Sequence, residues 1–128
     1  MTDAAKLDSA SRLRQSLCRL RDEAARLMEE FLSREPHVRG SVYELRRKCG
    51  KPSCACAKGG ALHCCMAITW SEGRRKRLRS LGPTDEAKLR RLTERYRVLR
   101  RTRARLVDVH AEILDVIDRL ETLGREEP

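Results

Sequence analysis

The chain has 128 residues and a net charge of +10, with 38% charged but only 3% aromatic side chains. This composition excludes a large globular core and is typical of long helices or a coiled coil. No apolar run approaches the roughly 18 residues of a membrane span, and the N-terminus lacks the apolar segment of a secretory signal. We therefore expect a cytoplasmic protein.

The charge is concentrated in the middle of the sequence. Residues 41–83 carry 10 basic and 2 acidic side chains, and residues 84–107 carry 9 basic and 3 acidic ones. Residues 108–128, by contrast, carry 2 basic and 7 acidic ones. This asymmetry favours a polyanionic partner for one part of the molecule.

Residues 1–38 predict an N-terminal amphipathic helix that is capped by Asp8 or Ser9 and runs to about Leu32. Apolar residues recur along it at alternating spacings of four and three, which is the pattern of a coiled-coil seam. These residues are Leu13, Leu17, Leu20, Ala24, Leu27 and Phe31.

Residues 39–83 predict a small β module. Segments 39–48, 66–70 and 74–81 have the β-branched or loosely alternating pattern of short strands. Joined in order, they predict a three-stranded meander in which a cysteine-rich loop separates the first two strands.

Residues 84–128 predict one long C-terminal helix, capped by Thr84 and ended by Gly124. Its seam again alternates spacings of three and four, and beyond Leu106 the apolar stripe becomes too wide for a single partner helix. The predicted seam comprises Leu89, Leu92, Tyr96, Leu99, Arg103, Leu106, His110, Ile113, Ile117 and Leu120.

Together these segments predict one structural domain of α+β class, mostly α. The first helix adjoins the β module, as does the start of the last helix, so we expect the two to pack antiparallel over residues 84–107. The apolar stripe from Leu106 to Leu123 then stays exposed, which predicts a homodimer through this coiled coil.

Five of the six cysteines lie within residues 49–65, CGKPSCACAKGGALHCC. Clustered cysteines in a reducing compartment indicate metal ligands rather than disulfides. Cys18 lies far from this cluster, and we interpret it as a small core residue.

Three thiolates and one imidazole form a closed, tetrahedral zinc site. Cys49, Cys54 and Cys56 supply the thiolates, in a C-x4-C-x-C spacing, and predict one Zn²⁺ per chain. The fourth ligand is His63 or one of the two cysteines after it. Adjacent side chains on a strand point to opposite faces, so at most one joins the site. The alternates are Cys64 and Cys65.

The sequence RGSVYELRRKCGKPSCACAKGGALH, followed by TWSEGRRKRLRSLGP, resembles an uncharacterised bacterial and phage family of small proteins. Members of that family are often found near mobile elements, and the resemblance covers about residues 39–105. It implies a metal site formed by Cys49, Cys54, Cys56 and His63. The chain departs from the pattern in having Cys64-Cys65 where Gly-Pro is usual, and one extra residue between Cys56 and His63. The other matching positions are Gly40, Ser41, Gly50, Lys51 and Pro52.

The basic residues of the β module and of the following helix are the candidate nucleic-acid-binding residues. Arginine predominates among them, and its planar guanidinium suits phosphate. We expect them to form one continuous surface. The alternative is a charged edge strand that merely resists aggregation. The candidates are Arg46, Arg47, Lys48, Arg74, Arg75, Lys76, Arg77, Arg79, Arg90, Arg91, Arg97 and Arg101.

These features favour a zinc-stabilised nucleic-acid-binding accessory or regulatory protein, with DNA favoured over RNA. Two alternatives stay open. One is a coiled-coil adaptor for an acidic partner, and the other is a thiol-based metal or redox sensor. We expect no enzyme, because the sequence has no pattern of catalytic acids, nucleophiles or phosphate loops. Trp70 and Tyr43 are interpreted as core residues, with base stacking as the alternative.

Overall fold

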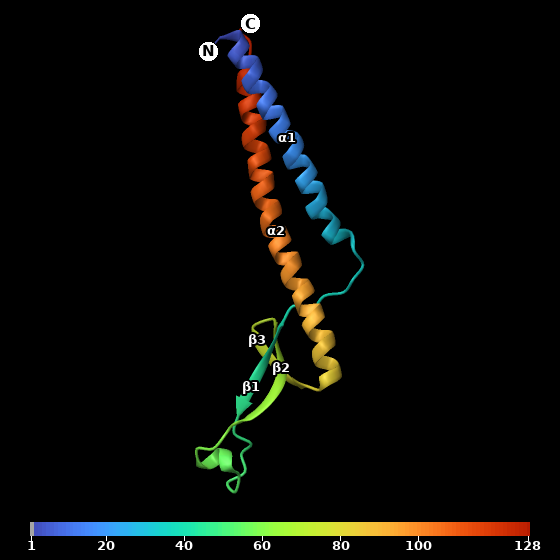
Figure 1. Cartoon of the computed structure of the whole chain (residues 1–128), viewed down its shortest axis with the longest axis vertical. Coiled ribbons are helices and arrows are strands. Elements are labelled where there is room, and N and C mark those ends of the chain that lie inside the picture. The colour runs from blue at the N-terminus through green and yellow to red at the C-terminus, as the bar shows by residue number, and fades with distance from the viewer. Residues whose placement is uncertain (1) are drawn as a thin grey trace. The chain divides into compact units, whose positions relative to one another are not determined.

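The computed structural model describes residues 2–128. Two helices and a three-stranded antiparallel sheet confirm the predicted class (Figure 1). None of the described helices combines the length and apolar character that a membrane crossing requires. The elements in chain order are α1 (Asp3–Leu32), β1 (Ser41–Arg47), the 3-10 turn η1 (Ala55–Lys58), β2 (His63–Glu72), β3 (Arg75–Leu81) and α2 (Pro83–Gly124).

The chain forms two compact units. We call the first the helical unit; it consists of Met1–Arg34 and Leu99–Pro128. The second, which we call the sheet unit, is the continuous segment Glu35–Val98. Each unit has its own buried residues.

Helix α1 begins earlier than the sequence predicts. The Thr2 hydroxyl accepts a hydrogen bond from the backbone N–H of Ala5 at 3.2 Å and caps the helix. The predicted cap at Asp8 or Ser9 is therefore wrong. Asp8 lies inside the helix and forms an i,i+4 ion pair with Arg12 at 2.9 Å.

The predicted seam of α1 is confirmed from Leu13 to Leu27, where each seam residue is buried or half-buried. Phe31, at the end of the seam, is 45% exposed. Cys18 is exposed, so its interpretation as a core residue is wrong. It follows a seam position directly, and one residue turns a helix by about 100°.

Helix α2 begins at Pro83, so the predicted cap at Thr84 is also wrong. The backbone N–H of Glu86 donates to the Gly82 carbonyl at 2.9 Å, which closes the first helical turn. Proline suits this first position because its missing N–H would have no partner inside the helix. The predicted end at Gly124 is confirmed.

The buried face of α2 changes phase along the helix. Leu89, Leu92 and Tyr96 are buried or half-buried, as predicted. In the helical unit Leu106, Ile113 and Leu120 are half-buried, as predicted, but the alternate seam positions move one residue earlier, to Thr102, Val109 and Val116. Three predicted seam residues are exposed instead: Arg103, His110 and Ile117.

The cause is an additional spacing of three in the buried pattern. The buried or half-buried residues Tyr96, Leu99 and Thr102 follow one another in two successive steps of three. The prediction assumed a step of four after Leu99, to Arg103. Such a stammer shifts the contact face of a coiled-coil helix. Threonine at position 102 has no apolar signature, so the sequence pattern favoured Arg103 by spacing alone.

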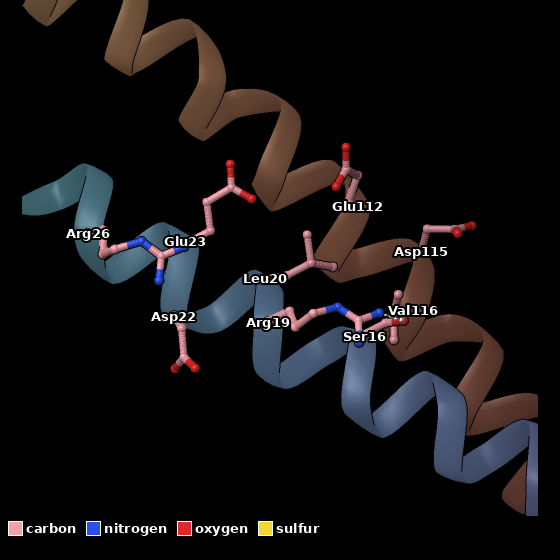
Figure 2. A pocket seen from close by; sticks show the side chains of 9 residues that line it. All are labelled: Ser16, Arg19, Leu20, Asp22, Glu23, Arg26, Glu112, Asp115 and Val116. Atoms are coloured by element: carbon pink, nitrogen blue, oxygen red, sulfur yellow. Dashed lines mark hydrogen bonds between the residues drawn. The ribbon is translucent and has the colours of Figure 1, made fainter.

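Within the helical unit, α1 lies antiparallel to the C-terminal part of α2, which confirms the predicted direction. Arg105 Nε and Nη2 donate to the two carboxylate oxygens of Glu23 at 2.7 and 3.1 Å. Leu20 of α1 and Val116 of α2 line one groove between the helices (Figure 2). The expected packing of α1 over residues 84–107 is therefore wrong for residues 84–98, and the stripe from Leu106 to Leu123, which was expected to stay exposed, is buried or half-buried at its seam positions.

In the sheet unit, an extended segment lies against the start of α2 instead. The backbone N–H of Val38 donates to the Leu92 carbonyl at 3.1 Å. The His37 ring stacks on Tyr96 with 5.9 Å between the ring centroids. Because this segment takes the place expected for the first helix, α1 pairs with the later part of α2.

The sheet is the predicted meander, in the order β1-β2-β3. The central strand holds the two most buried sheet residues, Ala67 and Ile68. Gly73 and Arg74 form the two-residue turn into β3, and the φ of Gly73 is +62°. A positive φ at the first turn position is typical of a hairpin turn that matches strand twist.

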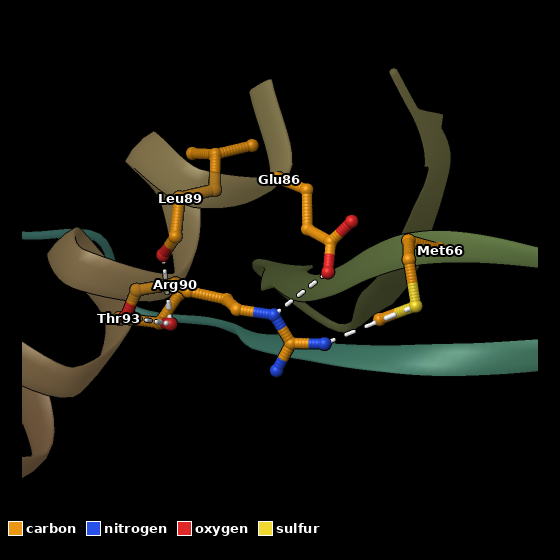
Figure 3. A network of polar contacts seen from close by, with 5 residues as sticks. All are labelled: Met66, Glu86, Leu89, Arg90 and Thr93. Carbon is orange, nitrogen blue, oxygen red and sulfur yellow. Dashed lines mark hydrogen bonds and ion pairs between the residues drawn. The ribbon is translucent and has the colours of Figure 1, made fainter. Parts of the chain in front are cut away.

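The first turns of α2 contact the sheet through Arg90 (Figure 3). Its Nε donates to Glu86 at 2.9 Å, and its Nη2 approaches the Met66 sulfur at 3.9 Å. Thr93 is 1% exposed, and its hydroxyl donates to the Leu89 carbonyl at 2.8 Å. The buried hydroxyl is thereby satisfied inside the helix.

Candidate metal centre

Three separate segments bring four metal-ligand side chains together. Cys49 follows β1, Cys54 and Cys56 flank the start of η1, and His63 opens β2. One ligand atom from each lies within 4.8 Å of all the others. Because β1 and β2 are paired, with Arg47 opposite His63, the sheet holds the two ends of the cysteine loop side by side.

Two tight turns place the middle cysteines. The backbone N–H of Cys54 donates to the Lys51 carbonyl at 3.1 Å and closes a turn with Pro52 at its second position. Proline favours that position because its φ is already close to the value required. The N–H of Ala57 then donates to the Cys54 carbonyl at 3.0 Å, which starts η1.

The glycine pair after η1 returns the chain towards β2. Gly59 has a φ of +83°, which glycine adopts without strain. The Gly60 N–H donates to the Ala55 carbonyl at 2.8 Å. A Cβ on Gly60 would lie 2.7 Å from that oxygen, so no larger residue fits without a backbone shift.

The spacing of the ligand atoms fits a tetrahedral metal ion. The sulfur atoms of Cys49 and Cys56 are 3.6 Å apart, and the Cys54 sulfur lies 3.2 Å from His63 Nε2. Ligands around tetrahedral zinc are about 3.6–3.8 Å apart, given the usual zinc–sulfur and zinc–nitrogen distances. A disulfide requires sulfur atoms about 2.05 Å apart, so these cysteines are not bridged.

The thiols and the imidazole stabilise one another's charged forms. The backbone N–H of Cys56 and then the His63 ring lower the pKa of Cys54 to about 6. The Lys51 N–H lowers the pKa of Cys49, and contact with Cys54 raises the pKa of His63. Cys54 is therefore largely thiolate at neutral pH, the form that binds metal.

Cys56 is the buried member of the set, at 1% exposure. The backbone N–H of Cys49 favours its thiolate. Burial and the neighbouring thiols of Cys54 and Cys49 outweigh this hydrogen bond, so the pKa of Cys56 is raised. A metal ion would replace that proton and neutralise the clustered sulfur charge.

The two alternates for the fourth ligand lie outside this group. The Cys64 thiol is 3.9 Å from the Leu62 carbonyl, and the Cys65 thiol is 3.9 Å from the Ser80 hydroxyl. Cys64 lies on the opposite face of β2 from His63. Cys65 shares the His63 face but lies two residues further along the strand, about 7 Å away. Strand geometry thus brings His63 alone to the three thiols.

The family model for a domain of unknown function (DUF6788) matches residues 11–91. The chain belongs to the DUF6788 family. The match contains the whole cysteine cluster and His63, and it confirms the expectation of an uncharacterised family. Comparisons with curated proteins and with solved structures gave no match.

In this DUF6788 chain the basic residues of β1 and those at the start of β3 lie at opposite ends of the sheet. Arg47 of β1 pairs with His63, beside the metal centre. Arg75 of β3 pairs with Glu72, next to the hairpin turn at the opposite end of β2. Arg47 of β1 therefore does not lie beside Arg75 of β3, contrary to the expectation that these basic residues are neighbours.

Several predicted phosphate-binding residues have acidic neighbours. Arg77 pairs with Glu72 at 2.8 Å, and Arg90 pairs with Glu86 at 2.9 Å. Arg46 and Arg97 have looser pairs with Glu44 and Glu94, and Arg101 also has a polar or ionic contact. The remaining candidates are exposed and have no ion-pair partner among residues 2–128: Arg47, Lys48, Arg74, Arg75, Lys76, Arg79 and Arg91.

The structure adds two residues that sequence reasoning did not select. Arg39 and Tyr96 lie with Trp70 and Lys76 around a small groove of the sheet unit. Arg39 is isolated in the sequence, and Tyr96 fits the apolar seam of α2. No sequence pattern therefore distinguished either residue.

Proposed function

We propose that this protein is a zinc-stabilised, non-enzymatic nucleic-acid-binding factor with an accessory or regulatory role and a preference for DNA. The observation that carries the proposal is the set of exposed basic residues without ion-pair partners in the sheet unit. Four of them, Arg74, Arg75, Lys76 and Arg79, lie on β3 and the turn before it.

Zinc is the metal that the donor set suits best. Three cysteine thiolates and one imidazole are a usual set for structural zinc, and they leave no open position for water. The ion therefore holds the cysteine loop rather than performing chemistry. One such group among the described residues corresponds to one zinc per chain.

Phosphate binding explains the charge of β3 better than protection of an edge strand does. One or two lysines are sufficient to discourage edge-to-edge pairing. Five of the seven residues from Gly73 to Arg79 are basic, which is more than that purpose needs. Arginine also binds phosphate oxygens through two parallel hydrogen bonds.

The helical unit supports a dimer. Met28 and Leu32 of α1 lie to one side of the seam and are 47% and 78% exposed. Val107, Leu114 and Ile117 lie to the same side on α2 and are 43–60% exposed. We call these five residues the apolar face. An exposed apolar surface contributed by both helices is typical of a protein interface.

A second copy of the chain is the partner that fits this face. On α1 this side also carries the basic residues Arg14 and Arg21, at intervals of seven from Met28, and on α2 it carries the acidic residue Glu121, seven residues from Leu114. A two-fold arrangement that sets α1 of one copy against α2 of the other pairs these opposite charges, as a self-complementary interface requires.

The opposite side of the helical unit is polar. Arg19 and Arg26 of α1 and Glu112 and Asp115 of α2 line the groove there (Figure 2). These charged side chains suit solvent rather than a dry interface. The contrast between the two sides therefore favours association through the apolar face.

The nucleic-acid proposal is tested by the salt dependence of binding to duplex DNA. If about five phosphates are neutralised, log K against log salt has a slope of about −4 to −5. Replacing Arg74, Arg75 and Arg79 together by Ser should flatten it by about 2 to 3 units, because each lost contact removes about 0.9. Metal content should not change.

The matched control replaces three ion-paired arginines of the helical unit by Ser, namely Arg12, Arg119 and Arg125. This variant has the same loss of net charge and should keep a slope within about one unit of the wild type. Equal flattening in both variants would show that only net charge matters. Absence of binding to DNA and RNA at low salt would refute the proposed function.

A further inference from the structure

A small groove in the sheet unit is lined by two aromatic and two cationic residues. Its volume is about 260 Å³. Trp70 comes from β2, Tyr96 from α2, Arg39 from the segment before β1, and Lys76 from β3. The rest of the lining is small or polar: Gly40, Ser41, Thr69 and Ser71.

Both aromatic rings are half-buried and held by their surroundings. His37 stacks on Tyr96 with an angle of 22° between the ring planes, which fixes the orientation of the tyrosine. Gly40 lets the chain pass close to Trp70. A Cβ there would lie 3.4 Å from the Trp70 Cβ and 2.9 Å from the Thr69 carbonyl oxygen.

The two cations of the groove are available to a ligand. Arg39 and Lys76 are exposed, and neither has an ion-pair partner among the described residues. An aromatic surface next to unpaired cations suits a planar group that carries a negative charge. Nucleic-acid bases joined by phosphates have this combination.

We propose that this groove binds one unpaired nucleobase of single-stranded nucleic acid. The base stacks against the aromatic side chains Trp70 and Tyr96, and Arg39 and Lys76 hold the flanking phosphates. This inference rests on the proposed function and refines it, because bases inside a duplex are stacked on one another and cannot enter such a groove. Single strands are therefore the preferred partner.

The groove lies next to basic residues of the predicted phosphate-binding set. Lys76 belongs to β3, between Arg75 and Arg77. A nucleic-acid single strand held at the groove therefore meets further basic residues next to its phosphate backbone. The aromatic rings supply a contact with the base that does not depend on salt. Stacking of this kind tolerates any base, since every base has an aromatic face.

The test uses the full-length, zinc-loaded protein and the fluorescence of Trp70, which is the only tryptophan in the chain. Titration with a short oligothymidylate at low salt should quench this fluorescence. Titration with a duplex of equal length should bind with little quenching. Tyr96→Leu should weaken binding of the single strand by about tenfold and leave duplex affinity unchanged, because one stacking ring is lost.

Three further variants keep the result interpretable if Tyr96→Leu folds poorly. Tyr96→Phe retains the ring and should bind the single strand like the wild type. Arg39→Gln changes an exposed residue and should lower the affinity for the single-stranded oligonucleotide several-fold. Tyr43→Leu makes the matched change outside the groove and should leave the preference for single strands intact.

Single-strand binding without a change in Trp70 fluorescence would overturn the inference. An equal loss of single-strand and duplex affinity in Tyr96→Leu would do the same. Both results would leave nucleic-acid binding itself in place. Failure of the wild type to bind either probe would overturn the proposed function together with the inference.

Discussion

The cysteine loop and the helical unit are held together by different forces. Between β1 and β2, Cys56 is the only buried residue, so the loop has almost no apolar core. The helical unit buries Ala24, Val109 and Val116 between two helices. With the proposed zinc bound, the loop depends on ligand atoms around one ion, whereas the helices depend on apolar area spread over several turns.

This difference determines which perturbation each region resists. Removal of a single ligand opens a tetrahedral site completely, because binding free energy is also the folding free energy of the loop. A helical seam loses stability gradually as individual contacts are removed. The two regions should therefore respond independently to metal removal and to substitution of seam or interface residues.

The largest expected effect follows metal removal. A strong chelator, or Cys54→Ser, should abolish ordered structure in the cysteine loop while the helical circular dichroism signal is largely retained. Elemental analysis should find about one zinc per chain in the wild type and much less in the variant. Proteolysis should then cleave within residues 49–62.

Cys18→Ser is the matched control, because Cys18 is exposed on α1 and lies outside the ligand group. It should change neither metal content nor proteolysis. Metal-free, reduced protein whose loop resists proteolysis would show that the turns alone hold the loop. The contrast between the two regions would then disappear.

The next largest effect concerns the apolar face of the helical unit. Leu114→Asp combined with Ile117→Asp should convert a dimer into monomers at micromolar concentration, because it places charge in the interface. Light scattering measures the mass, and zinc content should stay unchanged. Thr122→Asp introduces a charge on the polar side and should leave the dimer intact.

A wild-type monomer at micromolar concentration would contradict the proposed dimer. The apolar face would then have another partner. Loss of zinc in the doubly substituted variant would show instead that the cysteine loop and the helical unit are coupled rather than independent.

The smallest expected effect concerns the ion pair between Glu23 and Arg105 within the helical unit. The hydrogen bond from Arg105 holds the pKa of Glu23 below its usual value. A lowered carboxylate pKa contributes stability above the unfolded pKa, about 4.3 for glutamate, and this contribution is lost as pH falls through the folded pKa. Glu23→Gln should therefore lower the thermal midpoint at pH 7 but not in strong acid.

Glu29→Gln provides the control on the same helix, because Glu29 is exposed and has no ion-pair partner among the described residues. Its thermal midpoint should follow that of the wild type across the pH range. A Glu23→Gln variant that is equally destabilised at all pH values would assign the effect to packing rather than to charge.

Local features of this protein could be predicted because they depend on neighbouring residues. The apolar spacing of α1 indicated its seam, and the short β-rich segments indicated a three-stranded meander. The C-x4-C-x-C spacing indicated three of the four members of the metal centre. Helix starts were predicted less well, since Thr2 and Pro83 compete with later residues that are equally good caps.

The fourth member of the metal centre depended on strand pairing. His63, Cys64 and Cys65 have comparable ligand chemistry, and their order along the chain does not distinguish them. The pairing of β1 with β2 placed His63 beside the end of β1. The same pairing separated Arg47 from Arg75, which sequence proximity had suggested were neighbours.

By itself, the sequence determined the helices, the strands and the three cysteine ligands, because periodicity and turn chemistry act over a few residues. Tertiary structure alone decided which surfaces meet. Val38 and His37 cover the start of α2, and the step of three from Leu99 to Thr102 turns a different face of α2 towards α1. Several segments compete for each apolar surface, and only the folded chain determines which one can reach it.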